Sequence, residues 1–257
     1  MCYLLGRPMT LAHDNLEEFL DPVTYDEENR LDEEREFFLD RVRRYGGPVL
    51  DLACGTGRLT KPIAETGVRC VGVDLSDAML RHAEETSRGL PIDYVLADCR
   101  EVALEARFGF VLLTGNAFQG FLTDGDQRRL FSTVADHLRS GGGFAFETRN
   151  PSARVFTKAA QREWERSYPR KDGTIVDVHC ITRFDPMTDI LHVVTHRHIR
   201  GGEALPPTRI ALRYSSDAHC RRQLAVARLS VVEAYGDFFG APLGPKSPSL
   251  VYVCERR

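Results

Sequence analysis

A glycine-punctuated segment, residues 49–60, offers the clearest chemistry in this chain. It runs Val-Leu-Asp-Leu-Ala-Cys-Gly-Thr-Gly-Arg-Leu-Thr. Its apolar start suits a central parallel strand, and Gly55 and Gly57 let the backbone approach a ligand where a Cβ would collide. A helix that opens near Arg58 would present unpaired N–H groups to the polar end of a nucleotide-like ligand. The segment therefore predicts a strand, a ligand-binding turn and a helix.

Acidic residues stand at the ends of the second and third predicted strands. Residues 71–74 end in Asp74, whose carboxylate is placed to accept hydrogen bonds from the two hydroxyls of a ribose. Residues 92–97 are followed by Asp98, whose carboxylate suits an exocyclic amine. The alternative is that each acid only caps a helix or a turn. The repetition at two successive strand ends argues against that alternative.

Other residues near the strand ends extend the predicted site. Ser76 is a candidate helix N-cap, and Met79 can lie against a flat ring. A fourth strand, residues 108–113, is followed by Thr114 and Asn116. Because open α/β sheets bind ligands at the carboxyl ends of their strands, these residues are expected to share one site.

A nicotinamide or flavin dinucleotide is the competing ligand for such a turn. Its fingerprint needs a third small residue for helix–strand packing, and Thr60 occupies that position here. Asp98 also has no standard role in dinucleotide binding. Both departures count against a dinucleotide.

The ordered set of motifs resembles the class I S-adenosylmethionine-dependent methyltransferases, in particular those that act on small molecules. The residues that carry the resemblance are 51–57, Asp74, Asp98, Cys99, the region of Asn116 and residues 138–151. The chain departs from the family at Ala53, which replaces the first glycine of the turn, and the added methyl is expected to tighten the space near the methionine moiety. The resemblance implies an α/β fold with a Rossmann-like seven-stranded sheet, S-adenosylmethionine as cofactor and methyl transfer as activity.

The resemblance also implies roles for individual residues. Tyr25 resembles a tyrosine that lies near the methionine carboxylate in small-molecule methyltransferases, and Arg30 or Arg35 is a candidate partner of that carboxylate. The predicted cofactor-binding residues are Tyr25, Asp51, Ala53, Gly55, Thr56, Gly57, Asp74, Leu75, Met79, Asp98, Cys99, Thr114 and Asn116.

Residues 152–213 predict an antiparallel sheet that interrupts the methyltransferase core, which comprises residues 1–151 and 214–257. Residues 174–184 alternate apolar and polar side chains, residues 185–189 suit a turn, and residues 190–200 return as a second strand. A further strand is expected around residues 209–213. Related methyltransferases carry such a sheet over the active site or at a dimer interface, so the resemblance is compatible with a homodimer.

Several charged side chains share one face of the predicted hairpin: Asp177, His179 and Arg183 on one strand, and His192, His196 and His198 on the other. With a turn near residues 185–188, Asp177 is expected roughly opposite His196. This face is predicted to be a solvent-facing side of the sheet, an acceptor-binding wall with a histidine base, or a metal site. No compact metal-binding motif is present and this class of methyl transfer does not generally need a metal, so no metal is predicted.

The acceptor side of the site rests on residues at strand ends and in the inserted sheet. A hydroxyl acceptor needs a general base, whereas a neutral amine needs only a proton acceptor or a path to water. The candidate catalytic residues are His179, His196 and Glu147. The candidate acceptor-binding residues are Gln119, Arg149, Asn150, Trp164, Tyr168, Tyr235 and Phe238. The four aromatic residues among them are equally expected to be packing residues.

The composition of the chain limits the classes of molecule that it is expected to bind. The chain has 257 residues and a formal net charge of -3, which provides no basic footprint for nucleic acid. Residues 116–119, Asn-Ala-Phe-Gln, also differ from the Asn/Asp-Pro-Pro-aromatic motif of DNA amino methyltransferases. No apolar run approaches membrane-spanning length. Seven cysteines without a Cys-x-x-Cys pair suit buried thiols in a reducing cytoplasm.

The prediction is therefore a cytoplasmic methyltransferase that acts on a small metabolite, with no nucleic acid or membrane partner. The resemblance to amino-sugar enzymes with similar inserted sheets favours nitrogen over oxygen as the acceptor atom and a place in secondary metabolism. The alternatives are a protein that binds S-adenosylmethionine but catalyses another reaction, and a binding module whose inserted sheet is a protein interface.

Overall fold

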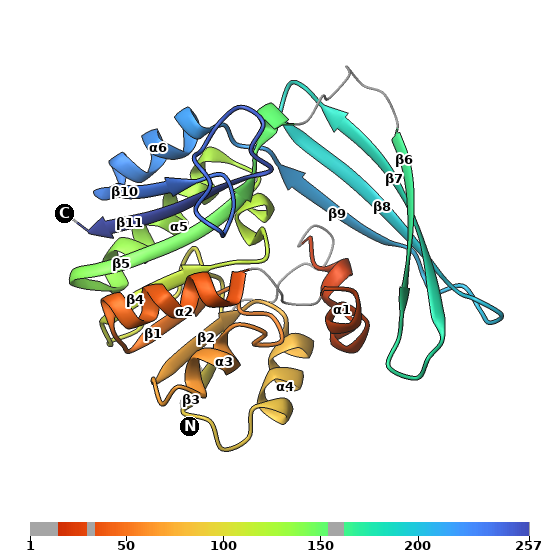
Figure 1. The fold of residues 1–257 in the computed structure, drawn as a ribbon, viewed down its shortest axis with the longest axis horizontal. Helices are drawn as coiled ribbons and strands as arrows, with labels where there is room; N and C mark the ends of the chain where they lie inside the picture. The colour runs from red at the N-terminus through yellow and green to blue at the C-terminus, as the bar shows by residue number, and fades with distance from the viewer. Residues whose placement is uncertain (1–14, 30–33, 154–161, 257) are drawn as a thin grey trace.

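A seven-stranded sheet forms the centre of the protein, and a four-stranded sheet projects from it (Figure 1). The computed structural model describes residues 15–29, 34–153 and 162–256. The central strands, in spatial order, are β10 (Leu229–Tyr235), β11 (Ser249–Arg256), β5 (Leu138–Arg149), β4 (Phe108–Leu113), β1 (Val49–Leu52), β2 (Cys70–Asp74) and β3 (Ile92–Leu96). Only β11 runs antiparallel to its neighbours β10 and β5. This architecture confirms the predicted fold class.

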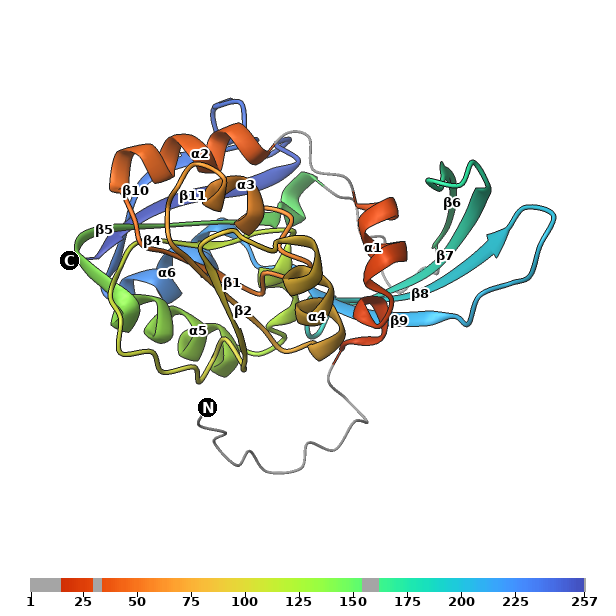
Figure 2. The same cartoon turned by 90° about the horizontal axis from the view of Figure 1, so that it is seen from below.

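Helices cover both faces of the central sheet (Figure 2). The helices are α1 (Pro22–Glu28), α2 (Glu34–Tyr45), α3 (Thr60–Ala64), α4 (Asp77–Thr86), α5 (Asp124–His137) and α6 (Asp217–Val226), with 3-10 turns η1 (Glu17–Phe19), η2 (Ala117–Gly120) and η3 (Pro151–Ala153). α2 and α3 lie on one face, and α5 and α6 on the other. β1 sends Val49 into one apolar core and Leu50 and Leu52 into the other, which explains its unbroken apolar sequence.

Helix starts follow local capping chemistry. The Ser76 hydroxyl accepts a hydrogen bond from the Met79 N–H at 3.3 Å, so the predicted N-cap of α4 is confirmed. Thr123 caps α5 in the same way. The sequence pattern predicts a helix over residues 124–139 and a strand over residues 144–148. α5 instead ends at His137, because β5 already begins at Leu138. The pattern also predicts a helix over residues 31–44; α2 is described from Glu34, and residues 31–33 lie outside the described residues.

The second sheet has the order β6 (Arg162–Pro169), β7 (Ile175–Asp185), β8 (Ile190–Ile199) and β9 (Thr208–Arg213). The β7–β8 hairpin closes at the pair Asp185–Ile190, so Asp177 lies opposite His198 and His179 opposite His196. The predicted pairing of Asp177 with His196 is therefore wrong by two residues, because the turn ends later than its sequence suggests. Strand β6 was not predicted, because its Glu- and Arg-rich sequence lacks a clear apolar alternation.

The second sheet stands beyond the carboxyl ends of the parallel strands, and α1 lies between the two sheets (Figures 1 and 2). η1 contacts β9, while α1 contacts both α4 and β6. In the described ranges, no helix combines the length and apolar character needed to cross a membrane. The fold thus places one face of the second sheet opposite the strand ends where ligands bind in such sheets.

Candidate active site

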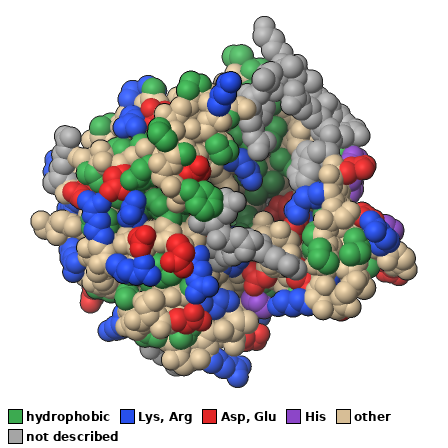
Figure 3. All heavy atoms as spheres, viewed as in Figure 1, with side chains coloured by type: hydrophobic (Ala, Val, Ile, Leu, Met, Phe, Trp, Pro, Cys, Tyr) green, Lys and Arg blue, Asp and Glu red, His purple; other side chains and the backbone are tan. Residues whose placement is uncertain are grey.

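A cavity of about 1320 Å³ lies between the carboxyl ends of the central strands and the second sheet. Figure 3 shows the surface hollowed between these two parts, with charged side chains of both signs interspersed around it. Most of the residues predicted for the cofactor line this cavity: Tyr25, Ala53, Gly55, Asp74, Leu75, Met79, Asp98, Cys99, Thr114 and Asn116. The cavity therefore brings together side chains from four successive strand ends.

The turn after β1 is held by the carboxylate at the end of β2. Asp74 Oδ2 accepts a hydrogen bond from the Gly55 N–H at 2.7 Å, and its Oδ1 accepts one from the Ser76 N–H at 2.8 Å. Burial raises the pKa of Asp74, although these backbone donors oppose the rise. Ala53 has φ +53°, a left-handed conformation that a glycine would adopt without strain. Alanine at this position therefore strains the backbone and also adds a methyl group to the cavity wall.

Three residues predicted for the cofactor support the turn from outside the cavity. Asp51 is buried, accepts a hydrogen bond from Thr60 Oγ1 at 2.5 Å and has its pKa raised to about 7 by that burial. Thr56 donates to Asp26 at 2.6 Å. Gly57, at φ +75°, packs so closely on Tyr94 that a Cβ would lie 2.7 Å from its hydroxyl. These three residues do not line the cavity, and their contact with the cofactor stays a prediction.

The acid after β3 has a partner that the sequence did not reveal. Arg100 Nε donates to both carboxylate oxygens of Asp98 at 2.9 Å, and Arg100 also reaches Asp126 on α5. Burial alone would raise the pKa of Asp98, but the hydrogen bonds from Arg100 outweigh it and lower that pKa. Cys99 lies beside the turn and accepts a hydrogen bond from the Ala53 N–H at 3.2 Å.

Tyr25 reaches the cavity from α1 and is supported by Arg58. The Arg58 guanidinium lies 5.7 Å from the centre of the Tyr25 ring, and its Nη1 donates to the Asn29 carbonyl at 2.8 Å. Of the arginines singled out in the sequence, Arg35 is exposed on α2 and Arg30 lies outside the described residues. The signal that could have identified Arg58 is its place directly after the glycine turn.

Glu147 lies on β5 behind the strand ends and not on the cavity wall. Its Oε1 accepts a hydrogen bond from the Asn116 N–H at 2.6 Å, while its Oε2 has no hydrogen-bond partner among the described residues. Burial raises the pKa of Glu147 to about 7. Asn116 has φ +57°, so the carboxylate holds a strained turn that borders the cavity. This geometry supports a positioning role more directly than the predicted role as a base.

The residues predicted for the acceptor separate into two groups. Arg149 lines the cavity and donates to Gln119 Oε1 at 3.2 Å, so Gln119 acts through it. Asn150 turns away and donates to the Gly244 and Ser247 carbonyls. Tyr235 and Phe238 pack around Phe37 of α2, away from the cavity. Their predicted acceptor contact is corrected to core packing.

Trp164 and Tyr168 of β6 were predicted to stack on a flat acceptor. The backbone of Trp164 pairs with Cys180, but its side chain lies outside the described part of the structure. Tyr168 is buried against Val176, Val178 and Cys180, and it does not line the cavity. Tyr168 therefore packs on the second sheet, which is the alternative that the sequence left open.

The two faces of the second sheet differ in chemistry. Cys180, Val193 and Thr195 belong to the face that lines the cavity. His179 and His196 alternate with these residues and lie on the opposite face, where their rings stack 6.2 Å apart. The expectation that either histidine acts as a base in the cavity is therefore corrected by strand parity. No cluster of potential metal ligands occurs among the residues that the structure describes.

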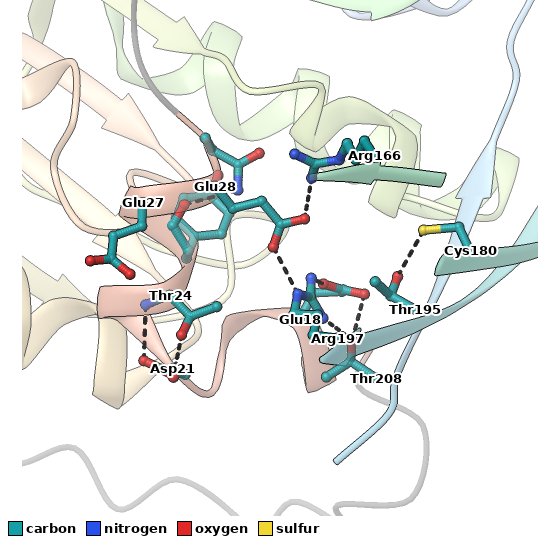
Figure 4. A network of polar contacts seen from close by, with 12 residues as sticks. Glu18, Asp21, Thr24, Glu27, Glu28, Arg166, Cys180, Thr195, Arg197 and Thr208 are labelled. Carbon is teal, nitrogen blue, oxygen red and sulfur yellow. Dashed lines mark hydrogen bonds and ion pairs between the residues drawn. The ribbon is translucent and has the colours of Figure 1, made fainter. Parts of the chain in front are cut away.

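A buried ion network joins the N-terminal segment to the cavity face of the second sheet (Figure 4). Arg197 Nη2 donates to Glu18 at 2.5 Å, its Nε donates to Glu28 at 2.8 Å, and its Nη1 donates to Thr208 at 2.7 Å. Glu28 also pairs with Arg166 of β6. Because Glu28 belongs to the helix that carries Tyr25, this network fixes α1 between the strand ends and the second sheet.

Comparison with known proteins gives a consistent result for the central part of the chain. A family model described as a methyltransferase domain matches residues 49–142. The cypemycin N-terminal methyltransferase of Streptomyces sp is 27% identical over 214 residues, which cover 82% of this chain and 84% of that protein.

Solved structures extend the likeness to the whole fold. The CcbJ methyltransferase from Streptomyces caelestis matches with a TM-score of 0.83 at 23% identity, covering 95% of this chain and 99% of that one. CalS10 from Micromonospora echinaspora, an amino pentose methyltransferase solved with S-adenosylmethionine bound, matches with a TM-score of 0.67 at 18% identity, covering 91% and 95%. These likenesses include the second sheet as well as the central one.

The raised pKa of Glu147 predicts a pH-dependent stability. The carboxyl group has an ordinary pKa of 4.5 when unfolded and about 7 when folded, so the folded state loses stability as pH rises between these values. Glu147→Gln keeps an acceptor for the Asn116 N–H and removes the charge. We expect this variant to exceed the parent in unfolding free energy at pH 8 by on the order of 1–3 kcal/mol, and the gap to narrow toward pH 4.

Urea unfolding of both proteins across this pH range checks the expectation. Glu101→Gln, at an exposed position, serves as the matched control and should follow the parent. A parent–variant gap that stays constant with pH would contradict the assignment.

The Arg197 network predicts a large stability difference between two arginines of the second sheet. Arg197→Met leaves two largely buried carboxylates without their shared cation, so we expect the unfolding free energy to fall by roughly 3–5 kcal/mol. Arg200→Met removes an exposed ion pair with Asp177 and should leave stability unchanged. Denaturant unfolding of both variants measures the contrast, and similar losses would show that the network does not hold α1.

Proposed function

Because the chain belongs to the class I S-adenosylmethionine-dependent methyltransferases, we propose that it methylates a nitrogen atom of a small-molecule acceptor. The observation that carries the choice of nitrogen is the chemistry of the cavity wall. None of the described histidines lines the cavity, and its carboxylates already accept hydrogen bonds. A hydroxyl acceptor would need a base at this wall, whereas a neutral amine brings its own lone pair.

The carboxylates of the wall illustrate this point. Glu18 and Glu28 share Arg197, and Asp98 and Asp126 share Arg100. Asp74 is engaged by two backbone N–H groups. Burial also raises the pKa of the Tyr25 phenol, which keeps its proton at neutral pH. Each of these groups would have to give up a bond, or a proton that it holds firmly, to serve as a base.

The cofactor, S-adenosylmethionine, fits the polar groups of the strand ends. The Thr114 hydroxyl and the Asn116 amide oxygen are buried, line the cavity and have no hydrogen-bond partner among the described residues. Such orphaned acceptors suit an ammonium group. A Cβ at Gly55 would meet no atom within 4 Å, so the turn leaves open space beside Asp74. We assign Asp74 to the ribose and Tyr25, Thr114 and Asn116 to the methionine moiety.

The protein's contribution to the reaction is positioning and exclusion of water. When bound, the cofactor supplies a methyl group already activated by a positively charged sulfur. Arg149 and the Asn116 turn line the cavity between the strand ends and the second sheet, and Gln119 holds Arg149. Holding the acceptor nitrogen in line with the methyl carbon converts an encounter into an intramolecular step. The proton released by the amine leaves through solvent.

The division of labour follows the two sheets. We assign cofactor binding to residues 1–151 and 214–257 and the acceptor wall to residues 152–213. The relatives, which include a cypemycin methyltransferase and an enzyme of calicheamicin biosynthesis, support a place in secondary metabolism. The free, buried cysteines of the described chain suit the reducing cytoplasm.

Matched acceptors test the proposal. Purified protein is incubated with methyl-labelled S-adenosylmethionine and either an amine or the alcohol of the same skeleton, and formation of S-adenosylhomocysteine is followed. We expect turnover with amines and none with the alcohols. Turnover with alcohols alone would overturn the choice of nitrogen. Cofactor binding without turnover on either series would favour a different reaction on the same cofactor.

The ribose assignment predicts that Asp74→Ala weakens S-adenosylmethionine binding by on the order of 1–3 kcal/mol, through loss of charge-assisted hydrogen bonds. Calorimetric titration measures the loss. Asp77→Ala, three residues away on the exposed first turn of α4, is the matched control and should bind like the parent. Unfolding curves of both variants separate a binding effect from collapse of the turn, and unchanged affinity in Asp74→Ala would remove the assignment.

A further inference from the structure

The cavity is larger than its cofactor requires. Typical pockets for small molecules and cofactors measure roughly 300–1,000 Å³, whereas this cavity measures about 1320 Å³. The groups suited to the cofactor gather at the strand ends, on one side of the cavity. The remaining space lies against the second sheet, so the side chains on that sheet indicate the size and polarity of the acceptor.

The lining of the second sheet is organised in cross-strand rows. Phe184 of β7, Leu191 of β8 and Leu212 of β9 are paired across the strands and form the first row beside the central sheet. The second row consists of Thr182, Val193 and Ile210, and the third of Cys180, Thr195 and Thr208. The cavity face therefore changes from apolar to polar with distance from the strand ends.

The ion network closes the far end of this face. Arg197 lies two residues beyond Thr195 on β8, so it forms a fourth position on the same face. At about 3.3 Å per residue, six residues separate the first row from Arg197 by roughly 20 Å. Leu16, Phe19, Phe121 and Leu122 add apolar side chains from other walls of the cavity. An acceptor of amino-acid size would leave most of this surface uncovered.

We infer that the acceptor is an amine with an extended apolar body, of the size of one or more rings, that lies along the rows of Phe184 and Val193. The inference rests on the proposed nitrogen methylation and adds the class of acceptor to it. The reacting nitrogen points toward the strand ends, where the cofactor groups gather. The apolar body displaces water from the face of β7, β8 and β9 and so also dries the site of transfer.

A series of primary amines tests this inference. The probes are methylamine, benzylamine, 2-phenylethylamine, 3-phenylpropylamine and 4-phenylbutylamine, and the measured quantity is kcat/KM from S-adenosylhomocysteine formation. Burial of one methylene contributes about 0.8 kcal/mol, which corresponds to roughly fourfold in kcat/KM. We expect a rise of that order for each added methylene. Equal values for methylamine and 4-phenylbutylamine would overturn the inference and leave nitrogen methylation standing.

Adjacent valines of β8 provide matched variants. Val193 lines the cavity, and Val194 alternates to the other face of the sheet. Val193→Phe should lower the ratio of kcat/KM for 4-phenylbutylamine to that for methylamine at least tenfold, because the larger ring occupies the second row. Val194→Phe should leave the ratio unchanged. Equal effects of the two substitutions would contradict the assigned face.

A binding measurement separates failure of the inference from failure of the proposed function. Calorimetric titration of 4-phenylbutylamine and methylamine into the protein saturated with S-adenosylhomocysteine requires no methyl transfer. At least tenfold tighter binding of the larger amine, lost in Val193→Phe, supports the apolar acceptor face even if no amine is methylated. Equal or undetectable binding of both amines overturns the inference whatever the activity assay shows.

Discussion

The cavity depends on one buried guanidinium, that of Arg197, which lies between the carboxylates of Glu18 and Glu28. The two carboxylates belong to the segment that carries Tyr25, and the guanidinium belongs to the second sheet. Removing three charges from water is costly unless each is paired, so the segment and the sheet are stable together in this arrangement rather than apart. The second sheet and the strand ends of the central sheet are thereby linked to each other through α1.

A second constraint acts at the strand ends, where side chains hold the backbone of the turns that border the cavity. The carboxylate of Asp74 holds the N–H groups of Gly55 and Ser76, so the turn after β1 and the start of α4 are oriented by one side chain. The left-handed conformations of Ala53 and Asn116 are maintained by contacts of the same kind. Backbone strain at these positions is sustained by surrounding hydrogen bonds, as is common at binding sites.

The central sheet was predictable because its signals are local. An apolar strand followed by a turn residue or an acid recurs four times, and parallel strands must bring such ends to one edge. The register of the β7–β8 hairpin was not predictable, because the sequence does not specify how many turn residues precede the return strand. That two-residue error kept the faces of the sheet correct and changed only the partners of Asp177 and His196.

The partners of charged residues were also beyond sequence analysis. Arg197 pairs with Glu18 across 179 residues, and Arg100 pairs with Asp126 across 26 residues. Strand parity could have removed His179 and His196 from the site only if the buried face of the hairpin had been known. Tyr235 and Phe238 were acceptor candidates because they lie at the end of β10 and in the segment before β11, and only their contacts with Phe37 reveal that they pack in the core.

The lack of a base on the described wall and the apolar rows of the second sheet have the same consequence. A site without a base requires an acceptor that is nucleophilic when neutral, and a low-polarity surface favours the neutral form of an amine over its ammonium form. For the proposed amine acceptor, the second sheet would therefore both bind the apolar body and favour the reactive, neutral form of the nitrogen. Under the proposed nitrogen methylation, specificity and reactivity would therefore be set by the same surface of the second sheet.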